Sequence, residues 1–220
     1  MKTIEEFIKI FNNNNYIMTH NHKTIWEKAY KPTQNKKSLA NSLSNNQEEK
    51  AFATLINRGI FLKEMFKYFQ FKNFAEVGTA EGYQFYVMAD YLQANNIDGF
   101  SYSCDIRDAR SDEFSNTYKK AIFTRGNSKH MAEKILDDKK KIDLFWIDGN
   151  HDKGAVLYDV IRLSKTQNKN CIWVFDDYNT RFGAFNEIKF LSRFNKSFYM
   201  DMGITASGRP NSLLVLEGSL

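Results

Sequence analysis

Short apolar runs alternate with helix-like segments along most of this chain, and this alternation is the strongest constraint on its fold. Five runs are of strand type, and they lie at 73–78, 100–105, 121–125, 142–147 and 171–175. Stretches such as DLFWI and CIWVF are apolar without a break, which is typical of strands buried on both faces of a parallel sheet. The alternation therefore predicts a doubly wound α/β fold.

The two ends of the chain add features to this pattern. Near the C-terminus, the runs KSFYMDM and NSLLVLE are separated by a loop that contains Gly and Pro, which indicates an antiparallel hairpin at the sheet edge. With that hairpin, the predicted sheet is seven-stranded and mostly parallel. We expect residues 1–46 to form an N-terminal helical extension, as a lid or an oligomer contact, and residues 47–220 to form one domain.

Thr3 is a candidate N-cap for a short helix through Phe11, within the extension. A longer helix is expected from Gln47 to Phe69, where apolar residues recur at helical spacing. Both helices precede the alternating strand pattern.

Charge and cysteine usage narrow the classes of partner and compartment. The formal net charge is +5, but the lysines are scattered and form no basic stripe between aromatic residues. We therefore expect no nucleic-acid partner, and rather a small or anionic acceptor. Cys104 and Cys171 lie in apolar strand candidates without a disulfide or metal spacing. With neither a signal peptide nor a membrane-length apolar stretch, a cytoplasmic protein is expected.

A glycine-rich turn, FAEVGTAEG, follows the first of the parallel strand candidates. Gly78 and Gly82 have no Cβ, so the chain can turn sharply there and a ligand can approach the backbone at the carboxyl end of the strand. The G-x-x-x-G spacing differs from the G-x-G-x-x-G of dinucleotide-binding folds. The turn predicts a cofactor site; a purely structural strand-to-helix turn is the alternative.

Polar residues also end the next two strand candidates. Asp105 ends the second strand, where a carboxylate can accept hydrogen bonds from both hydroxyls of a ribose. It could instead cap a helix or face water. Asn127 and Ser128 follow the third strand and could line the same site, or could simply cap the next helix.

Three carboxylates follow the fourth and fifth strand candidates: Asp148 comes after DLFWI, and Asp176 and Asp177 come after CIWVF. Because the two strands belong to one β-α-β unit, their tips should be neighbours. Three carboxylates at one edge repel each other unless a positive charge lies among them. A divalent cation with oxygen ligands, Mg²⁺ first, would supply that charge. Alternatively, one carboxylate caps a helix and another faces water.

With the glycine-rich turn, the segments WIDGNH and FDDYN resemble the class I S-adenosylmethionine-dependent methyltransferases. They are similar in particular to small bacterial metal-dependent O-methyltransferases with F-I-D-G-x-H followed by D-D-Y, a group related to the macrolide and aminocoumarin sugar O-methyltransferases. The resemblance covers about residues 70–180. It implies a Rossmann-like class I methyltransferase fold, with S-adenosyl-L-methionine as the cofactor.

The resemblance also implies roles for single residues. The cofactor-binding set it implies is Glu76, Gly78, Thr79, Ala80, Gly82, Asp105, Asn127, Ser128 and Asp148. The ligands of Mg²⁺ would be Asp148, Asp176 and Asp177. Many members read D-G-D-H where this chain has Asn150, so we take His151 as the candidate general base and Asp148 as the other catalytic residue. Alternatively, His151 only makes a supporting hydrogen bond at the start of the next helix. The ordinary pKa of imidazole, about 6.5, suits proton transfer near neutral pH.

The function predicted from these features is Mg²⁺-assisted O-methylation of a hydroxyl on a small molecule or sugar. For this reaction the protein must position the acceptor hydroxyl against the methyl group and help to remove its proton. Two alternatives stay open: a binding protein with this fold but no acceptor chemistry, and an NAD- or nucleotide-binding oxidoreductase. The G-x-x-x-G spacing and the hairpin argue against the oxidoreductase. We expect no membrane partner, while a homo-oligomer remains open.

Overall fold

The computed structural model describes residues 2–13, 45–110, 112–204 and 210–220. In these residues seven strands form one sheet in the order β3-β2-β1-β4-β5-β7-β6. The strands are β1 (Phe74–Val77), β2 (Ser101–Asp105), β3 (Ala121–Arg125), β4 (Ile142–Ile147), β5 (Gln167–Phe175), β6 (Lys196–Ile204) and β7 (Pro210–Glu217). The predicted seven-stranded α/β fold is confirmed.

The strand pairing explains where a ligand can bind. Strand β1 pairs in parallel with both β2 and β4, and β4 pairs in parallel with β5. The order along the sheet therefore reverses between β1 and β4, which is the switch point where open α/β sheets bind ligands. Strand β7 is antiparallel to β5 and to β6, so the predicted C-terminal hairpin is present.

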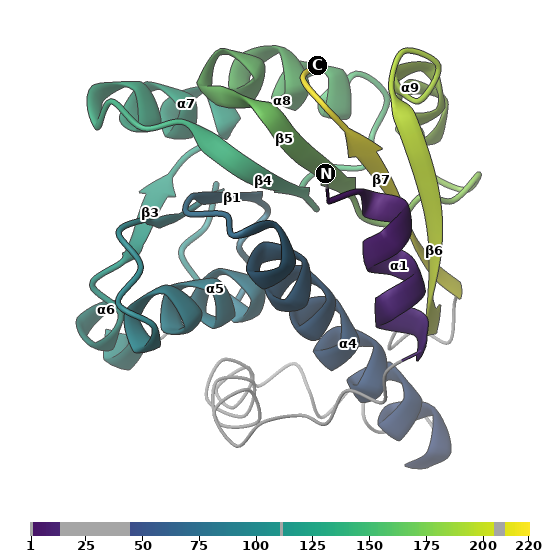
Figure 1. The fold of residues 1–220 in the computed structure, drawn as a ribbon, viewed down its shortest axis with the longest axis horizontal. Helices are drawn as coiled ribbons and strands as arrows, with labels where there is room; N and C mark the ends of the chain where they lie inside the picture. The colour runs from purple at the N-terminus through teal and green to yellow at the C-terminus, as the bar shows by residue number, and fades with distance from the viewer. Residues whose placement is uncertain (1, 14–44, 111, 205–209) are drawn as a thin grey trace.

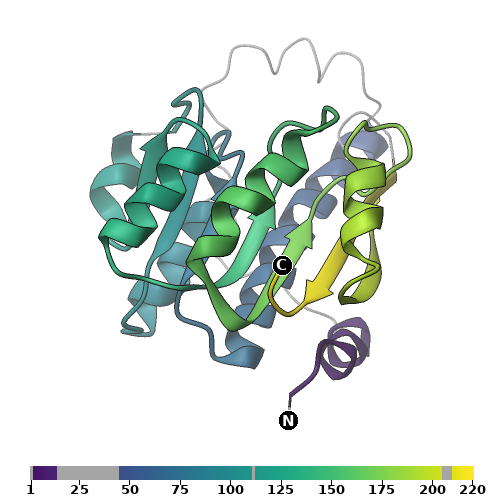
Figure 2. The same cartoon turned by 90° about the horizontal axis from the view of Figure 1, so that it is seen from above.

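Helices cover the two faces of the sheet, as Figure 1 shows. On one face α7, α8 and α9 lie side by side, which is clearest from above (Figure 2). On the other face lie α1, α4 and α5. The helix bounds are α1 (Ile4–Asn13), α4 (Asn45–Phe69), α5 (Tyr83–Ala94), α6 (Asp112–Thr117), α7 (Ser128–Asp137), α8 (Ala155–Leu163) and α9 (Phe185–Leu191), with a 3-10 turn η1 (Ser164–Thr166) after α8.

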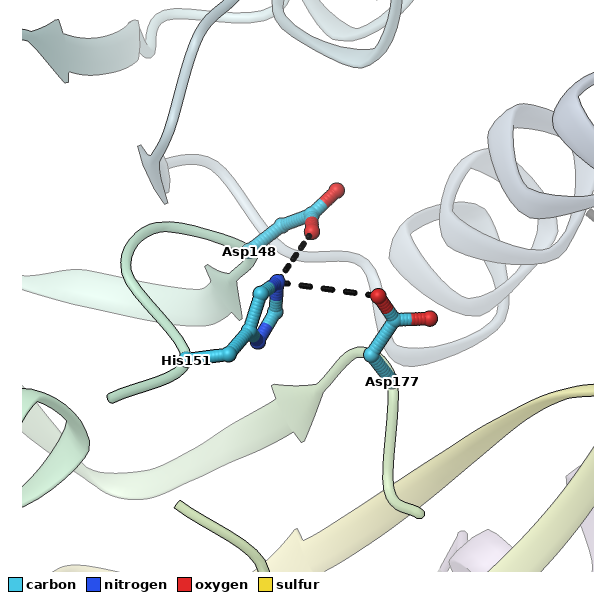
Figure 3. A group of neighbouring side chains, drawn as sticks. All are labelled: Asp148, His151 and Asp177. Atoms are coloured by element: carbon cyan, nitrogen blue, oxygen red, sulfur yellow. Dashed lines mark ion pairs between the residues drawn. The ribbon is translucent and has the colours of Figure 1, made fainter. Parts of the chain in front are cut away.

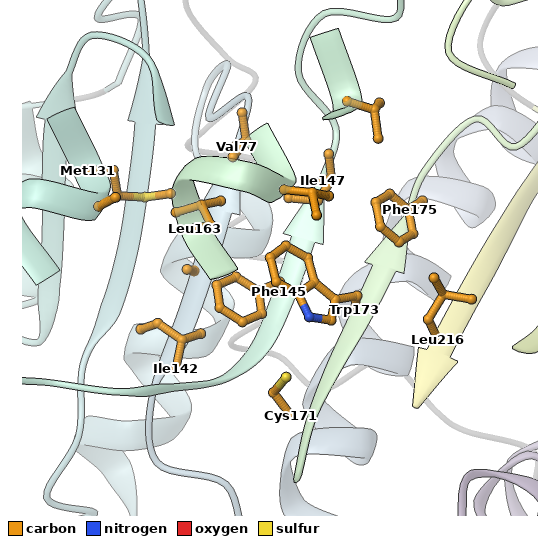
Figure 4. Close-up of a cluster of buried hydrophobic side chains, with 14 of the residues drawn as sticks. Val77, Met131, Ile142, Phe145, Ile147, Leu163, Cys171, Trp173, Phe175 and Leu216 are labelled. Atoms are coloured by element: carbon orange, nitrogen blue, oxygen red, sulfur yellow. The ribbon is translucent and has the colours of Figure 1, made fainter. Parts of the chain in front are cut away.

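The core under α7, α8 and α9 is built from the alternate side chains of the central strands (Figure 4). Phe145 of β4 stacks on Trp173 of β5, with ring centroids 3.8 Å apart. Both side chains are completely buried, and burial of an aromatic side chain of this size contributes about 2–3 kcal/mol. This packing fixes the tips of β4 and β5 relative to each other.

Helix α1 packs on the opposite face. The Oγ1 atom of Thr3 accepts from the backbone N–H of Glu6 at 3.2 Å, and Glu6 accepts from the N–H of Thr3 at 3.1 Å, so the predicted cap is a reciprocal capping box. Phe7 is buried against Phe61 of α4, with ring centroids 5.6 Å apart. The start of the predicted extension is thus part of the core, while residues 14–44 lie outside the described residues and the lid or oligomer role stays a prediction.

Two smaller expectations concern the whole chain. Cys104 and Cys171 are both buried free thiols, as their apolar surroundings predicted. Within the described ranges, every helix is too short or too polar to cross a bilayer.

Candidate functional site

The glycine-rich turn lies between the tips of β2 and β4. The backbone N–H of Gly78 donates to the carbonyl of Cys104 at 3.0 Å, and the N–H of Asp148 donates to the carbonyl of Val77 at 2.9 Å. Gly78 has φ +90°, and a Cβ placed there would lie 2.1 Å from the carbonyl oxygen of Asp148. Only glycine fits this position, because any side chain would collide with the neighbouring backbone.

A cavity of about 510 Å³ opens over this turn. Six of the predicted cofactor-binding residues line it: Gly78, Ala80, Asp105, Asn127, Ser128 and Asp148. The other lining residues include Ile106, Tyr158 and Asp159, which the sequence did not suggest. A volume of this size at a switch point suits a nucleoside-sized ligand.

The remaining predicted residues, Glu76, Thr79 and Gly82, support the turn from beside the cavity. Ser103 donates to the Oε2 atom of Glu76 at 2.8 Å, and its hydroxyl lies 2.6 Å from that of Thr79. Burial raises the pKa of Glu76 to about 8, with the Ser103 hydrogen bond opposing the shift and the charge of Asp105 adding to it. Glu76 therefore stays protonated at neutral pH in the free protein.

Asp105 lines the cavity, and backbone N–H groups hold its carboxylate. Its Oδ2 atom accepts from the N–H of Ala80 and its Oδ1 atom from the N–H of Arg107, both at 3.0 Å. Ile106, directly after it, lines the cavity although 72% of its surface is exposed. A carboxylate next to an exposed apolar side chain matches the two needs of a nucleoside, hydroxyl binding and packing against the base.

Asn127 combines the two roles that the sequence left open. Its Oδ1 atom accepts from the N–H of Lys129 at 3.2 Å, and with His130 it forms a capping box at the start of α7. It also lines the cavity, as does the buried Ser128.

Asp159 is a cavity residue that the sequence analysis missed. It lies on α8 and is only 7% exposed. Burial raises its pKa to about 6, and the Ser128 hydroxyl partly opposes this. The available signal was an acidic residue on the apolar face of the helix, between Val156 and Leu163.

The structure brings together the three carboxylates that follow β4 and β5, and the side chain of Arg58 from α4 reaches them. One terminal nitrogen of its guanidinium lies 2.7 Å from Asp176 Oδ2 and 3.7 Å from Asp148 Oδ2; the other lies 4.0 Å from Asp177 Oδ1. Arg58 is only 6% exposed. A protein cation thus supplies at least part of the positive charge that the sequence analysis assigned to a metal.

Asn211 of β7 links these groups. Its side-chain NH₂ donates to Asp176 Oδ1 at 3.0 Å and to Asp177 Oδ1 at 2.9 Å, while its Oδ1 atom accepts from Arg58 Nε at 3.1 Å. Asn211 is completely buried, and Asp176 is 2% exposed. The amide fixes the rotamers of both carboxylates.

His151 lies between two of these carboxylates, Asp148 and Asp177 (Figure 3). Its Nε2 atom is 3.6 Å from Asp148 Oδ1 and 3.6 Å from Asp177 Oδ2. The imidazole also contacts the ring of Phe182, with centroids 4.8 Å apart, which limits its rotation. The side chain is about a quarter exposed, so an incoming ligand can reach it.

The carboxylates perturb one another strongly. Burial raises the pKa of Asp148, the neighbouring Asp176 raises it further, and Arg58 opposes the shift. The pKa of Asp177 is also raised by burial and by Asp176, while Arg58 and His151 oppose this. The site therefore gains from any additional positive charge.

A divalent ion fits the group formed by Asp148, His151 and Asp177. One ligand atom each from Asp148, His151 and Asp177 lies within 4.8 Å of the other two. In this structure the carboxylate of Asp176 pairs with Arg58 and Asn211. Its predicted role as a metal ligand stays a prediction, as does the identity of the ion.

Comparison with known proteins supports the fold and the cofactor. Residues 75–178 match the model of a family described as a methyltransferase domain. An O-methyltransferase from Bacillus cereus, solved with S-adenosylhomocysteine, superposes with a TM-score of 0.58 at 12% identity, covering 96% of this chain and 97% of that one. The O-methyltransferase TomG of Streptomyces achromogenes, involved in tomaymycin synthesis and solved with S-adenosylmethionine, gives 0.54 at 13% identity, covering 80% and 91%.

A third similar structure is an RNA methylase. An rRNA methylase from Streptococcus thermophilus superposes with a TM-score of 0.52 at 9% identity, covering 68% of this chain and 87% of that one. No curated protein matches the sequence. At such low identities the structures establish the class I methyltransferase fold, and with the family match they support an S-adenosylmethionine-dependent methyltransferase.

Proposed function

We propose that this chain is an S-adenosylmethionine-dependent O-methyltransferase that acts on a hydroxyl of a small molecule or sugar. The observation that carries the proposal is the position of Asp148. This residue lines the cofactor cavity and also faces His151 at 3.6 Å. A methyl donor in the cavity and an acceptor beside the imidazole would therefore meet at one point, as an in-line transfer requires.

In this mechanism His151 removes the proton of the acceptor hydroxyl as the methyl group is transferred. Asp148 and Asp177 lie at equal distances from its Nε2 atom and stabilise the imidazolium that forms. Phe182 holds the ring, and Asn211 holds Asp177. Oxygen is favoured as the acceptor atom because the fifth strand ends in DDYN, with no N-P-P-Y-like motif of amino methylation.

Metal assistance is the second part of the proposal. A divalent ion, Mg²⁺ first, would lower the pKa of a coordinated hydroxyl and neutralise the excess negative charge at the strand tips. Its ligands would come from Asp148, Asp176 and Asp177, as the sequence predicts, or from Asp148, His151 and Asp177, which the geometry favours. In the second arrangement His151 is a ligand and cannot also act as the base.

The proposal is tested in two stages. Calorimetry should detect binding of S-adenosylhomocysteine but not of NAD, and Asp105→Ala should weaken that binding, because it removes the ribose acceptor. Wild-type protein should then transfer isotope-labelled methyl groups from the cofactor to members of a panel of sugar and phenol hydroxyls, while His151→Ala should be slowed by about 10²–10⁴-fold.

The outcomes separate the alternatives. Binding of NAD instead of S-adenosylhomocysteine would favour an oxidoreductase. Cofactor binding with no transfer to any hydroxyl would favour a binding protein, and transfer to RNA alone would move the acceptor to another class.

A further inference from the structure

Arg58 reaches the carboxylate cluster from outside the matched methyltransferase region. It lies on α4, which precedes β1, whereas the family match begins at residue 75. An arginine that is only 6% exposed and has three carboxylates within 4.0 Å is an internal ion-pair network. Burying such a charge is costly unless it is paired and hydrogen-bonded, and here it is both.

The oxygen atoms of the carboxylates divide into two sides. Arg58 faces Asp148 Oδ2, Asp176 Oδ2 and Asp177 Oδ1. His151 faces the other oxygens of two of them, Asp148 Oδ1 and Asp177 Oδ2 (Figure 3). Asp148 and Asp177 thus each present one oxygen to an arginine side and one to a histidine side.

Asp176 belongs to the arginine side alone. Its Oδ2 atom pairs with Arg58 at 2.7 Å, its Oδ1 atom accepts from Asn211 at 3.0 Å, and the residue is 2% exposed. For Asp176 to turn toward an ion beside His151, it would have to leave both partners, and the buried guanidinium would lose the shortest of its three ion pairs.

We propose that Arg58 is the built-in counter-cation of this cluster, which keeps the carboxylates assembled without a metal and withholds Asp176 from any divalent ion, so that such an ion binds on the histidine side alone. Arg58 is then a positioning residue. The metal-binding consequence rests on the proposed function; the role in assembling the cluster does not.

The charges determine what each substitution should do. Three carboxylates and one guanidinium leave two negative charges when His151 is neutral. Removing the guanidinium leaves three negative charges and frees Asp176 as a ligand. A unit charge a few Å away repels a bound cation strongly even at an effective dielectric constant of about 20. Loss of Arg58 should therefore increase the affinity of the cluster for a divalent ion by about tenfold or more.

The first measurement is the affinity for Mn²⁺, read from the electron paramagnetic resonance signal of free ion during titration of the full-length chain. Arg58→Met should bind Mn²⁺ at least about tenfold more tightly than wild type. Arg58→Lys retains the charge and should stay within a few-fold of wild type. Arg193→Met, on an exposed turn after α9, is the matched control and should leave the affinity unchanged.

Substitution of the carboxylates tests which of them face the ion. In wild type, Asp177→Asn should weaken Mn²⁺ binding by about tenfold or more, whereas Asp176→Asn should change it far less. In the Arg58→Met background, Asp176→Asn should become as harmful to Mn²⁺ binding as Asp177→Asn. An equal loss from the two substitutions in wild type would overturn the proposal, and so would an Arg58→Met affinity equal to or weaker than that of wild type.

Stability without metal is the second measurement, and it remains informative if Arg58→Met folds poorly. Arg58→Met should be less stable than wild type in a chelator, and either Mn²⁺ or the added substitution Asp176→Asn should recover much of the loss. If neither does so, Arg58 is not the counter-cation. Failure of S-adenosylhomocysteine binding would instead refute the proposed function and leave this stability result standing.

Discussion

Glu76 is a carboxyl group that folding buries beside Ser103 and Asp105, and its replacement by glutamine should stabilise the protein at alkaline pH. The residue is 1% exposed, and its pKa rises from 4.5 to about 8 on folding. The Ser103 hydroxyl can donate equally to the amide oxygen of glutamine, so the substitution removes the ionisation and keeps the hydrogen bond.

The sign of the effect follows from proton binding. Below about pH 4.5 both folded and unfolded chains hold the proton, and residue 76 adds no pH dependence. Between about pH 4.5 and 8 the unfolded chain releases the proton while the folded chain keeps it, so the stability of wild type falls as the pH rises. Each unit of pKa shift is worth about 1.4 kcal/mol, so the full penalty above pH 8 is at most about 5 kcal/mol.

The assay is urea unfolding of wild type and Glu76→Gln at several values between pH 5 and pH 9. The free energy of unfolding of wild type should fall relative to that of Glu76→Gln across this range, by several kcal/mol in total. Glu133→Gln, at an exposed position on α7, is the control and should run parallel to wild type. Equal pH slopes for wild type and Glu76→Gln would mean that Glu76 is ionised inside the folded protein, and that the reasoning is wrong.

Three further predictions concern the cavity and the proposed base. Asp159→Asn should stabilise the free protein above pH 6 by at most about 3 kcal/mol, because burial raises the pKa of Asp159 to about 6. Urea unfolding at pH 7.5 and pH 5 measures this gain in the free energy of unfolding, which should be smaller at pH 5. Gly78→Ala should destabilise the fold by several kcal/mol and abolish S-adenosylhomocysteine binding in calorimetry, since the new Cβ would lie 2.1 Å from the carbonyl oxygen of Asp148. Gly154→Ala, which also has positive φ but nothing within 4 Å of the new Cβ, should cost only about 1 kcal/mol and bind normally; similar losses in both variants would refute the packing argument. His151→Ala should flatten the acid limb of the pH–rate profile, and an unchanged limb would exclude His151 as the base.

The sequence predicted those parts of the site that depend on local order along the chain. The turn at Gly78, the carboxylate of Asp105 and the acidic ends of β4 and β5 all follow strand candidates directly. In a parallel sheet the carboxyl ends of neighbouring strands meet at one edge, so a strand assignment is enough to bring such residues together. That is why six of the predicted cofactor residues line one cavity.

Residues that reach the site through tertiary packing could not be predicted in the same way. Arg58 depends on the angle at which α4 crosses the sheet, and Asn211 depends on the register of β7 against β5 and β6. A change of one residue in that register would turn the amide of Asn211 to the other face of the sheet. Asp159 lies on the apolar face of α8, which is a signal in the sequence, but only the packing of that helix shows that it lines the cavity.

The carboxylate cluster illustrates how a correct physical requirement can be met by an unexpected group. Three carboxylates at neighbouring strand tips require a positive charge, and this requirement follows from the sequence alone. The structure meets it in part with Arg58, whose guanidinium lies 2.7 Å from Asp176. One positive charge does not balance three negative ones. Burial is the main cause of the raised pKa values of Asp148 and Asp177, and the charge of Asp176 raises both further. An ion beside His151 and an arginine on the opposite side are therefore compatible. We expect the charge of residue 58 to determine how tightly such an ion binds.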